Sequence, residues 1–139
     1  MMKMVSINES DHVFGMAIVK IFTPFLEEEK FIKKIEKWNK VIVVELKGIY
    51  TFSLIFDNGV ISCDYGEKEK YNLKLITSFD AFVGIAEGTT GLIPAFIRGK
   101  IKVKKIYNIF TFLKFITILL PALKRATAEP IAEGYIKVL

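Results

Sequence analysis

The feature that most constrains this sequence is an almost unbroken apolar run from Ile106 to Leu120. A run of this kind is either a membrane span or a helix that is buried on more than one side. This one is short for a span, carries Lys114 at its middle and is followed by Pro121. We therefore expect a long helix, from Ile106 to about Arg125, inside a soluble protein.

The polar positions of this expected helix are Asn108, Thr111 and Lys114, which fall on one narrow stripe. Apolar side chains cover most of the remaining circumference, whereas a helix that packs on one sheet needs only one apolar face. The helix therefore needs a second apolar neighbour besides the sheet. Short helices, an oligomer partner or a bound lipid could each supply that neighbour.

Composition raises the same question for the whole chain. Of its 139 residues, 52% are hydrophobic and the mean hydropathy is +0.38, so extra apolar surface must line a cavity, form an interface, touch a membrane or fill a dense core. The net charge of +5 suits solubility and loose attraction to anionic surfaces, and is too small to indicate a nucleic-acid partner. A single cysteine and a start without signal-peptide features predict a cytoplasmic protein.

The pattern of apolar residues predicts alternating helical and extended segments. Helices are expected over Val13–Phe22, from Pro24 to about Asn39, and over Phe79–Glu87 and Leu92–Ile97. Period-2 or β-branched patterns predict strands over five segments: Val41–Leu46, Tyr50–Phe56, Val60–Tyr65, Tyr71–Leu75 and Lys100–Lys104.

The order of these segments predicts an α+β fold, in which helices cover one face of a five-stranded, mainly antiparallel sheet. Asp57-Asn58-Gly59 predicts a tight hairpin turn, and the charged segment Gly66–Lys70 a second hairpin. Because no linker or repeat divides the chain, we expect one domain over residues 1–139. Its core is expected to span about residues 10–126, with a tail over 127–139.

Residues typical of catalysis are sparse. His12 is the only histidine, which argues against a histidine-rich metal site and most histidine-dependent triads. Cys63 falls within an alternating strand pattern that predicts a buried thiol without an activating neighbour. We therefore expect no enzyme activity, no metal and no cofactor.

The apolar residues of the short helices could instead form a cavity wall together with the long helix. Closed packing without a cavity fits the pattern equally well. The candidate wall residues on the short helices are Phe79, Phe82, Val83, Leu92 and Phe96, with Ile85 and Ile93 beside them, and those on the long helix are Ile106, Ile109, Phe110, Leu113 and Ile116.

Several lysines alternate along the last expected strand, at positions 100, 102 and 104, and Lys105 follows them. Such a stripe is typical of the solvated face of an edge strand. Transient contact with anionic lipid headgroups is the functional alternative.

The segment Leu92–Val103 resembles a signature of the sterol carrier protein type 2 family, in which an Ala-Phe pair in a short helix precedes a Gly-Lys pair that opens a strand. Gly88 matches an earlier glycine of that signature, and Phe56–Val60 resembles the family's turn. Trp38 is similar to a tryptophan of prokaryotic single-domain members. The resemblance runs from the first helix to Arg125.

This resemblance implies a five-stranded sheet and helices around an apolar tunnel, with Phe82, Phe96 and the long helix in its wall. It implies non-catalytic binding or carriage of a fatty acid, acyl-CoA, or an isoprenoid or sterol-like lipid. One departure concerns the tunnel mouth, because Lys105-Ile106 stands where the family has a glycine. A homodimer formed through the long helix, and an accessory domain that presents apolar substrates to an enzyme, stay open as alternatives.

Overall fold

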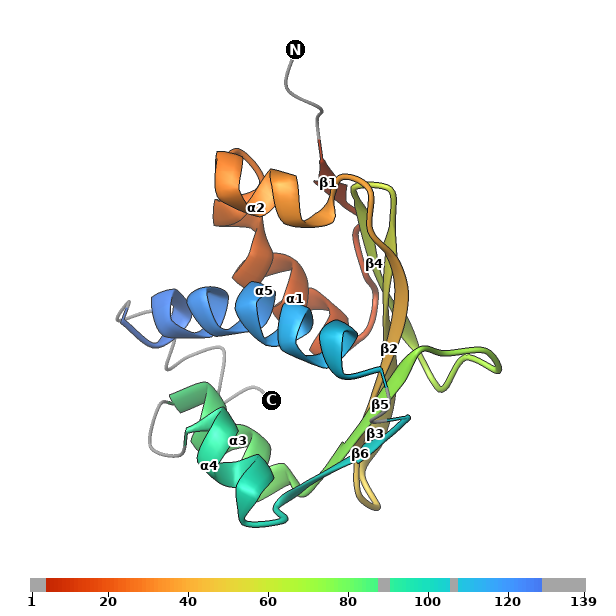
Figure 1. The fold of residues 1–139 in the computed structure, drawn as a ribbon, viewed down its shortest axis with the longest axis vertical. Helices are drawn as coiled ribbons and strands as arrows, with labels where there is room; N and C mark the ends of the chain where they lie inside the picture. Colours follow the sequence, from red (N-terminus) through yellow and green to blue (C-terminus); the bar gives the residue numbers. More distant parts are fainter. Residues whose placement is uncertain (1–4, 88–90, 106–107, 129–139) are drawn as a thin grey trace.

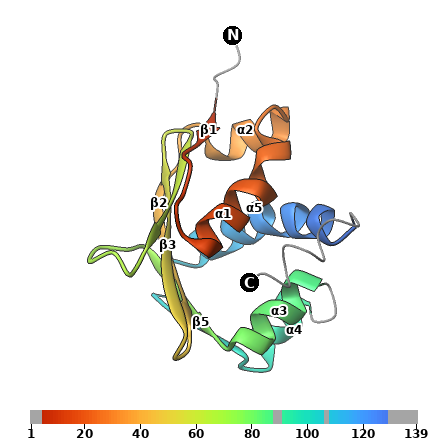
Figure 2. The same ribbon diagram turned by 180° about the vertical axis from the view of Figure 1, so that it is seen from behind.

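The computed structural model describes residues 5–87, 91–105 and 108–128. Figure 1 shows the sheet nearly edge-on, with the helices gathered on one of its faces, and Figure 2 shows the same two-layer arrangement from behind. The expected α+β architecture is thus confirmed. No helix of the described residues is long and apolar enough to cross a membrane.

The sheet has six strands in the order β1-β4-β3-β2-β5-β6. Five of them correspond to the expected strands: β2 (Asn39–Leu46), β3 (Tyr50–Asp57), β4 (Val60–Tyr65), β5 (Leu73–Thr77) and β6 (Ile101–Lys104). The expected number of five is wrong, because β1 (Ser6–Ile7) pairs in parallel with β4. Two residues are too few to show any periodicity, so the sequence pattern could not reveal β1.

The segment Gly66–Lys70 does not form the second hairpin that we expected. The strands β2, β3 and β4 form an antiparallel meander, but β5 lies on the other side of β2 and runs parallel to it. The chain therefore crosses behind the sheet between β4 and β5 (Figure 1). The central strand β2 holds three consecutive buried residues, Ile42, Val43 and Val44, so it is covered on both faces of the sheet.

Hydrogen bonds and ion pairs fasten this crossing segment to the helix-free face of the sheet. The Ser53 hydroxyl donates to the carbonyl oxygen of Gly66 over 2.7 Å and accepts from the Lys68 amide over 3.1 Å. The Lys74 ammonium group is buried between Glu67 and Glu45, and its pKa is raised because both carboxylates favour the charged form. These contacts satisfy the polar side chains that this face buries.

The first helix, α1 (Val13–Phe22), has its expected bounds. His12 occupies the N-cap position, and its Nδ1 accepts a hydrogen bond from the Gly15 amide over 3.2 Å. The single helix expected from Pro24 is split into a 3₁₀ turn, η1 (Thr23–Phe25), and α2 (Glu29–Ile35).

The packing of two phenylalanines explains this break. Phe25 and Phe31 are both buried, with ring centroids 5.9 Å apart. In a continuous helix, side chains six positions apart point about 120° away from each other. The extended backbone at Glu28 lets both rings face the core.

The two short helices, α3 (Phe79–Glu87) and α4 (Leu92–Ile97), have the expected bounds. Ser78 caps α3, since its hydroxyl accepts from the Ala81 amide. The long helix is α5 (Ile109–Ala128), and its expected start at Ile106 lies outside the described residues. The apolar face of the sheet and the inner sides of α1, α2 and α5 form one core, whose largest fully buried side chains are Phe22, Phe52, Phe56 and Phe115.

Candidate functional site

Aromatic rings mark the place where α3 and α4 meet the rest of the helical layer. The Phe82 ring of α3 stands edge-on to Phe14 of α1, with centroids 5.9 Å apart, and Phe14 stacks on Phe52 of β3 at 5.7 Å. On the other side, Phe96 of α4 lies 5.1 Å from Phe112 of α5. Figures 1 and 2 both show α3 and α4 beyond one end of the layer formed by α1 and α5.

Four of the expected wall residues gather at this meeting place. Phe79, Phe82 and Val83 of α3 and Phe96 of α4 are all half-buried. The three phenylalanines pack against the buried core without being closed into it. Apolar side chains in this condition are covered on one side only, so they could contact an apolar ligand on the other.

The expected wall residues of α5 divide into two sets. Ile116 is buried, whereas Ile109, Phe110 and Leu113 expose 40%, 84% and 48% of their surface. The structure thus places these three on the outer side of α5. Ile106 lies outside the described residues, as do the side chains of Ile85, Leu92 and Ile93.

Apart from Ile116, the residues of α5 that pack inward are not among the wall residues expected from the sequence. Phe112, Phe115 and Ile118 are buried, and so is Thr111, which belongs to the expected polar stripe. A helix that is apolar around most of its circumference gives little periodic signal, so the pattern could not fix its rotation. The polar stripe was the available signal, and it does not coincide with the solvent-facing side.

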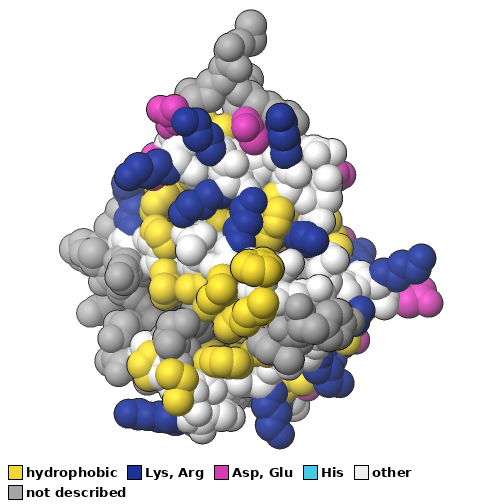
Figure 3. All heavy atoms as spheres, in the orientation of Figure 1, with side chains coloured by type: hydrophobic (Ala, Val, Ile, Leu, Met, Phe, Trp, Pro, Cys, Tyr) yellow, Lys and Arg dark blue, Asp and Glu magenta, His cyan; other side chains and the backbone are white. Residues whose placement is uncertain are grey.

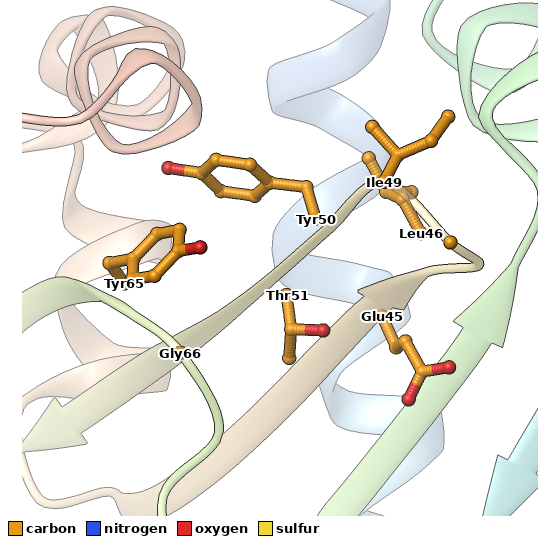
Figure 4. A pocket seen from close by; sticks show the side chains of 8 residues that line it. Glu45, Leu46, Ile49, Tyr50, Thr51, Tyr65 and Gly66 are labelled. Atoms are coloured by element: carbon orange, nitrogen blue, oxygen red, sulfur yellow. The ribbon is translucent and has the colours of Figure 1, made fainter.

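Two surface clefts lie apart from these expected wall residues. One, of about 280 Å³, is shown in Figure 4 at the β2–β3 turn, where Tyr50 and Tyr65 point to one side of the sheet and Glu45 and Thr51 to the other. The second, of about 400 Å³, lies at the opposite end of the same strands, between Asn39, Asp57 and Asn72. Both mix polar and apolar groups, so neither corresponds to the expected apolar tunnel, which stays a prediction.

The chemically reactive side chains are engaged in structural contacts. His12 bridges the start of α1 to the carbonyl oxygen of Cys63, 2.9 Å from its Nε2. Burial, with a smaller contribution from the Asp64 charge, raises the pKa of the Cys63 thiol to about 12. Among the described residues, no group of histidine, cysteine, aspartate and glutamate side chains is arranged to hold a metal ion.

The departure at Lys105 has a clear structural form. Lys105 adopts a left-handed backbone conformation with φ of 63°, which favours glycine. Its ammonium group donates to the Tyr71 carbonyl oxygen over 2.7 Å and lies 4.3 Å from the centre of the Tyr71 ring. The chain thus makes the turn between β6 and α5 without a glycine.

Several solved structures share this fold. One is the UbiJ-SCP2 ubiquinone synthesis protein, with 17% identity, a TM-score of 0.59, and coverage of 79% of this chain and 91% of that one. A second is protein TT1886 of Thermus thermophilus, with 16% identity, a TM-score of 0.57, and coverage of 91% and 97%. A third is sterol carrier protein 2 of Yarrowia lipolytica in its apo form, with 22% identity, a TM-score of 0.52, and coverage of 93% and 94%.

At these identities the likeness shows the fold. No curated protein sequence matches the chain. The model of the SCP-2 sterol transfer family, however, matches residues 25–120, which include the sheet from β2 to β6, α3, α4 and the first part of α5. This stretch contains the half-buried aromatic residues and the signature at Leu92–Val103. The chain therefore belongs to the SCP-2 sterol transfer family.

Proposed function

We propose that this protein binds and carries an apolar lipid without changing it chemically. The lipid would lie between α3–α4 on one side and the inner side of α5 on the other. The half-buried rings of Phe82 and Phe96 carry this proposal, because they join α3 and α4 to the rest of the helical layer and keep part of their apolar surface uncovered. The wall would include Phe79, Val83 and Ile116. Membership of a lipid-transfer family supports the same conclusion.

The ligand class follows from the chemistry of this wall. Phenylalanine, valine and isoleucine side chains offer apolar contact and no charge, so they favour a fatty acyl, isoprenoid or sterol-like body. A carboxylate or coenzyme A group would have to lie at the edge of the site. Ile109, Phe110 and Leu113 are exposed on the outer side of α5 and would contact only a ligand on that side, so the proposed wall consists of the other residues.

Uptake of a fluorescent fatty acid, together with native mass spectrometry of the purified chain, tests this function. We expect saturable fluorescence and a mass above that of the bare chain. Phe96→Asp should abolish uptake, because a buried carboxylate without a partner is unfavourable in an apolar wall. Ile97→Asp is the matched control, since Ile97 is the next residue and is 75% exposed. A bare mass together with no fluorescence change in the wild-type chain would refute the proposal.

A homodimer through α5 is the second candidate, and the exposure of Phe110 favours it. Phe112 and Phe115 are buried in the monomer, so they are not available to form a dimer interface. Only the outer side of α5, with Ile109, Phe110 and Leu113, offers an apolar face to a partner among the described residues of this helix. Sedimentation of the ligand-free chain, compared with Phe110→Ser, distinguishes this candidate from a monomeric carrier.

A further inference from the structure

The outer side of α5 exposes an apolar stripe made of Ile109, Phe110 and Leu113. Phe110 is 84% exposed, Leu113 48% and Ile109 40%, and their spacing of three and four residues places them on one helix face. Figure 3 shows apolar side chains gathered in the middle of the molecular face on which α5 lies. A solvent-exposed phenylalanine flanked by two further apolar side chains forms a continuous patch.

Lys114 and Lys34 border this stripe on one side. Lys114 follows Phe110 by one helical turn, and its ammonium group lies 5.1 Å from the centre of the Trp38 ring. Lys34 of α2 donates to the carbonyl oxygen of Thr117 over 3.0 Å, which brings its charge to the same helix. Figure 3 shows lysine and arginine side chains in a row directly above the apolar patch.

These lysines are close enough to repel one another. The pKa of Lys114 is lowered, first by burial and then by the charges of Lys34 and Lys40. Three ammonium groups are thus held together by α2, the start of β2 and α5, although their mutual repulsion opposes this arrangement. A negatively charged partner would relieve that repulsion.

We propose that the outer face of α5 docks on a bilayer surface that contains anionic phospholipid. Phe110 and Leu113 enter the boundary between headgroups and acyl chains, while Lys34, Lys40 and Lys114 lie among the phosphate groups. Apolar insertion and lysine–headgroup attraction are the two contributions that hold peripheral proteins on membranes. Here the apolar stripe of α5 lies beside lysines from α5, α2 and the start of β2.

A second copy of the chain fits this face less well. In a two-fold symmetric dimer the same patch lies on both protomers, so the border of the interface would carry the lysine clusters of both. An anionic bilayer matches the apolar stripe and the charges at the same time. This surface also differs from the lysine stripe of β6, where Lys102 and Lys104 are exposed without a large exposed apolar side chain on the same strand.

Co-sedimentation of the full chain with vesicles tests the proposal. We expect binding to phosphatidylcholine vesicles that contain phosphatidylglycerol, little binding to phosphatidylcholine alone, and weakening as salt increases. The triple change Lys34→Gln, Lys40→Gln and Lys114→Gln should weaken binding by about fivefold for each lysine. Its matched control is Lys47→Gln with Lys70→Gln and Lys102→Gln, which removes the same charge elsewhere and should bind more tightly than the first triple.

The apolar contribution has its own pair of variants. Phe110→Ser with Leu113→Ser should reduce vesicle binding at least tenfold, to judge from roughly 25 cal/mol per Å² of apolar area, whereas Ile49→Ser, at the exposed β2–β3 turn, should leave it unchanged. Thermal unfolding of each variant verifies folding, and Phe110, Leu113 and Ile49 are exposed and lie outside the core. If a lysine variant unfolds, the serine pair still decides the question.

Three results would overturn the proposal. They are wild-type protein that stays in solution with phosphatidylglycerol vesicles, equal weakening by both lysine triples, and a vesicle-free dimer that Phe110→Ser dissociates. Fatty-acid uptake by the serine pair separates this proposal from the carrier function. If the serine pair loses vesicle binding but keeps uptake, the stripe serves docking and not ligand binding. If the wild type shows no uptake, the carrier function is refuted and the docking proposal is not.

Discussion

The hydroxyl group of Tyr50 lies 2.6 Å from Nδ1 of His12, and it joins the start of β3 to the start of α1. The Gly15 amide donates to the same nitrogen, and Nε2 faces the Cys63 carbonyl oxygen. These partners assign the proton of the neutral ring to Nε2, with Nδ1 as the acceptor. One side chain thus connects a helix start to two strands.

Replacing His12 should therefore destabilise the protein. His12→Ala removes the helix cap and both strand contacts, and we expect a loss of about 1–2 kcal/mol in the free energy of unfolding. His12→Asn should recover part of this loss, because asparagine also caps helices. Urea denaturation measures both variants. Equal midpoints for wild type and His12→Ala would contradict the assigned role.

Gly15 should resist replacement by alanine although it lies in a helix. A Cβ atom at this position would lie 1.9 Å from Ser10 Oγ and 2.6 Å from His12 Nε2. Gly15→Ala should therefore lower stability, despite the gain of about 1 kcal/mol that alanine gives in a helix. In a chain that also carries Ser10→Gly and His12→Ala, the same change should become stabilising. Stabilisation in the wild-type background, measured by thermal unfolding, would contradict the crowding.

The Cys63 thiol should be inert in the folded protein. Because burial raises its pKa to about 12, almost no thiolate exists at pH 8, and thiol reagents should react only after unfolding. Rapid labelling of native protein would contradict this.

The same shift affects stability at alkaline pH. The folded-state pKa of Cys63 lies above the ordinary value of 9.0. The neutral buried thiol therefore makes its full contribution to the free energy of unfolding below pH 9, and this contribution is lost as pH rises towards 12. The loss from this group is at most about 1.4 kcal/mol per pH unit. Cys63→Ala should fall less steeply than wild type in urea denaturation between pH 9 and pH 11. Identical slopes would show that the thiol does not contribute.

Substitutions at Lys105 should measure the free-energy cost of a left-handed backbone conformation in a residue other than glycine. Lys105→Ala loses the contacts with Tyr71 and keeps a side chain in the left-handed region, whereas Lys105→Gly loses the same contacts and relieves the backbone. We expect the glycine variant to be the more stable of the two by about 1 kcal/mol. At Lys104, an extended residue of β6, the order should be reversed. Chemical denaturation of the four variants measures both orders.

Local pattern predicted most of the elements. The bounds of α1, α3 and α4 and the turn at Asn58-Gly59 follow from residues next to each other in the chain, so the sequence was sufficient there. The partner of β5 was not predictable in the same way. Leu73 and Leu75 fit a hairpin and a parallel pairing equally well, because alternation defines the faces of a strand and not its neighbours.

The site was less predictable than the fold. Phe82 and Phe96 were predicted as wall residues because the short helices offer apolar side chains and because the resemblance to the family implies this position, and their role as a wall stays a prediction. The rotation of α5 was not predictable, since packing against Phe56 and Phe96 decides it, and those contacts are distant in the sequence. The short β1 and the cap at His12 likewise depend on partners in β4 and β3, which no local pattern contains.

The crossing between β4 and β5 divides the sheet into two parts that differ in how they are attached to their neighbours. The strands β2, β3 and β4 can close through short local turns, whereas β5, α3, α4 and β6 attach to the sheet through pairing with one edge of β2. Protection of amides from hydrogen exchange should therefore be higher in the first part than in the second. Since the second part carries Phe82 and Phe96, a local opening along the β2–β5 edge would give a bulky lipid a route inward while the rest of the sheet stays intact.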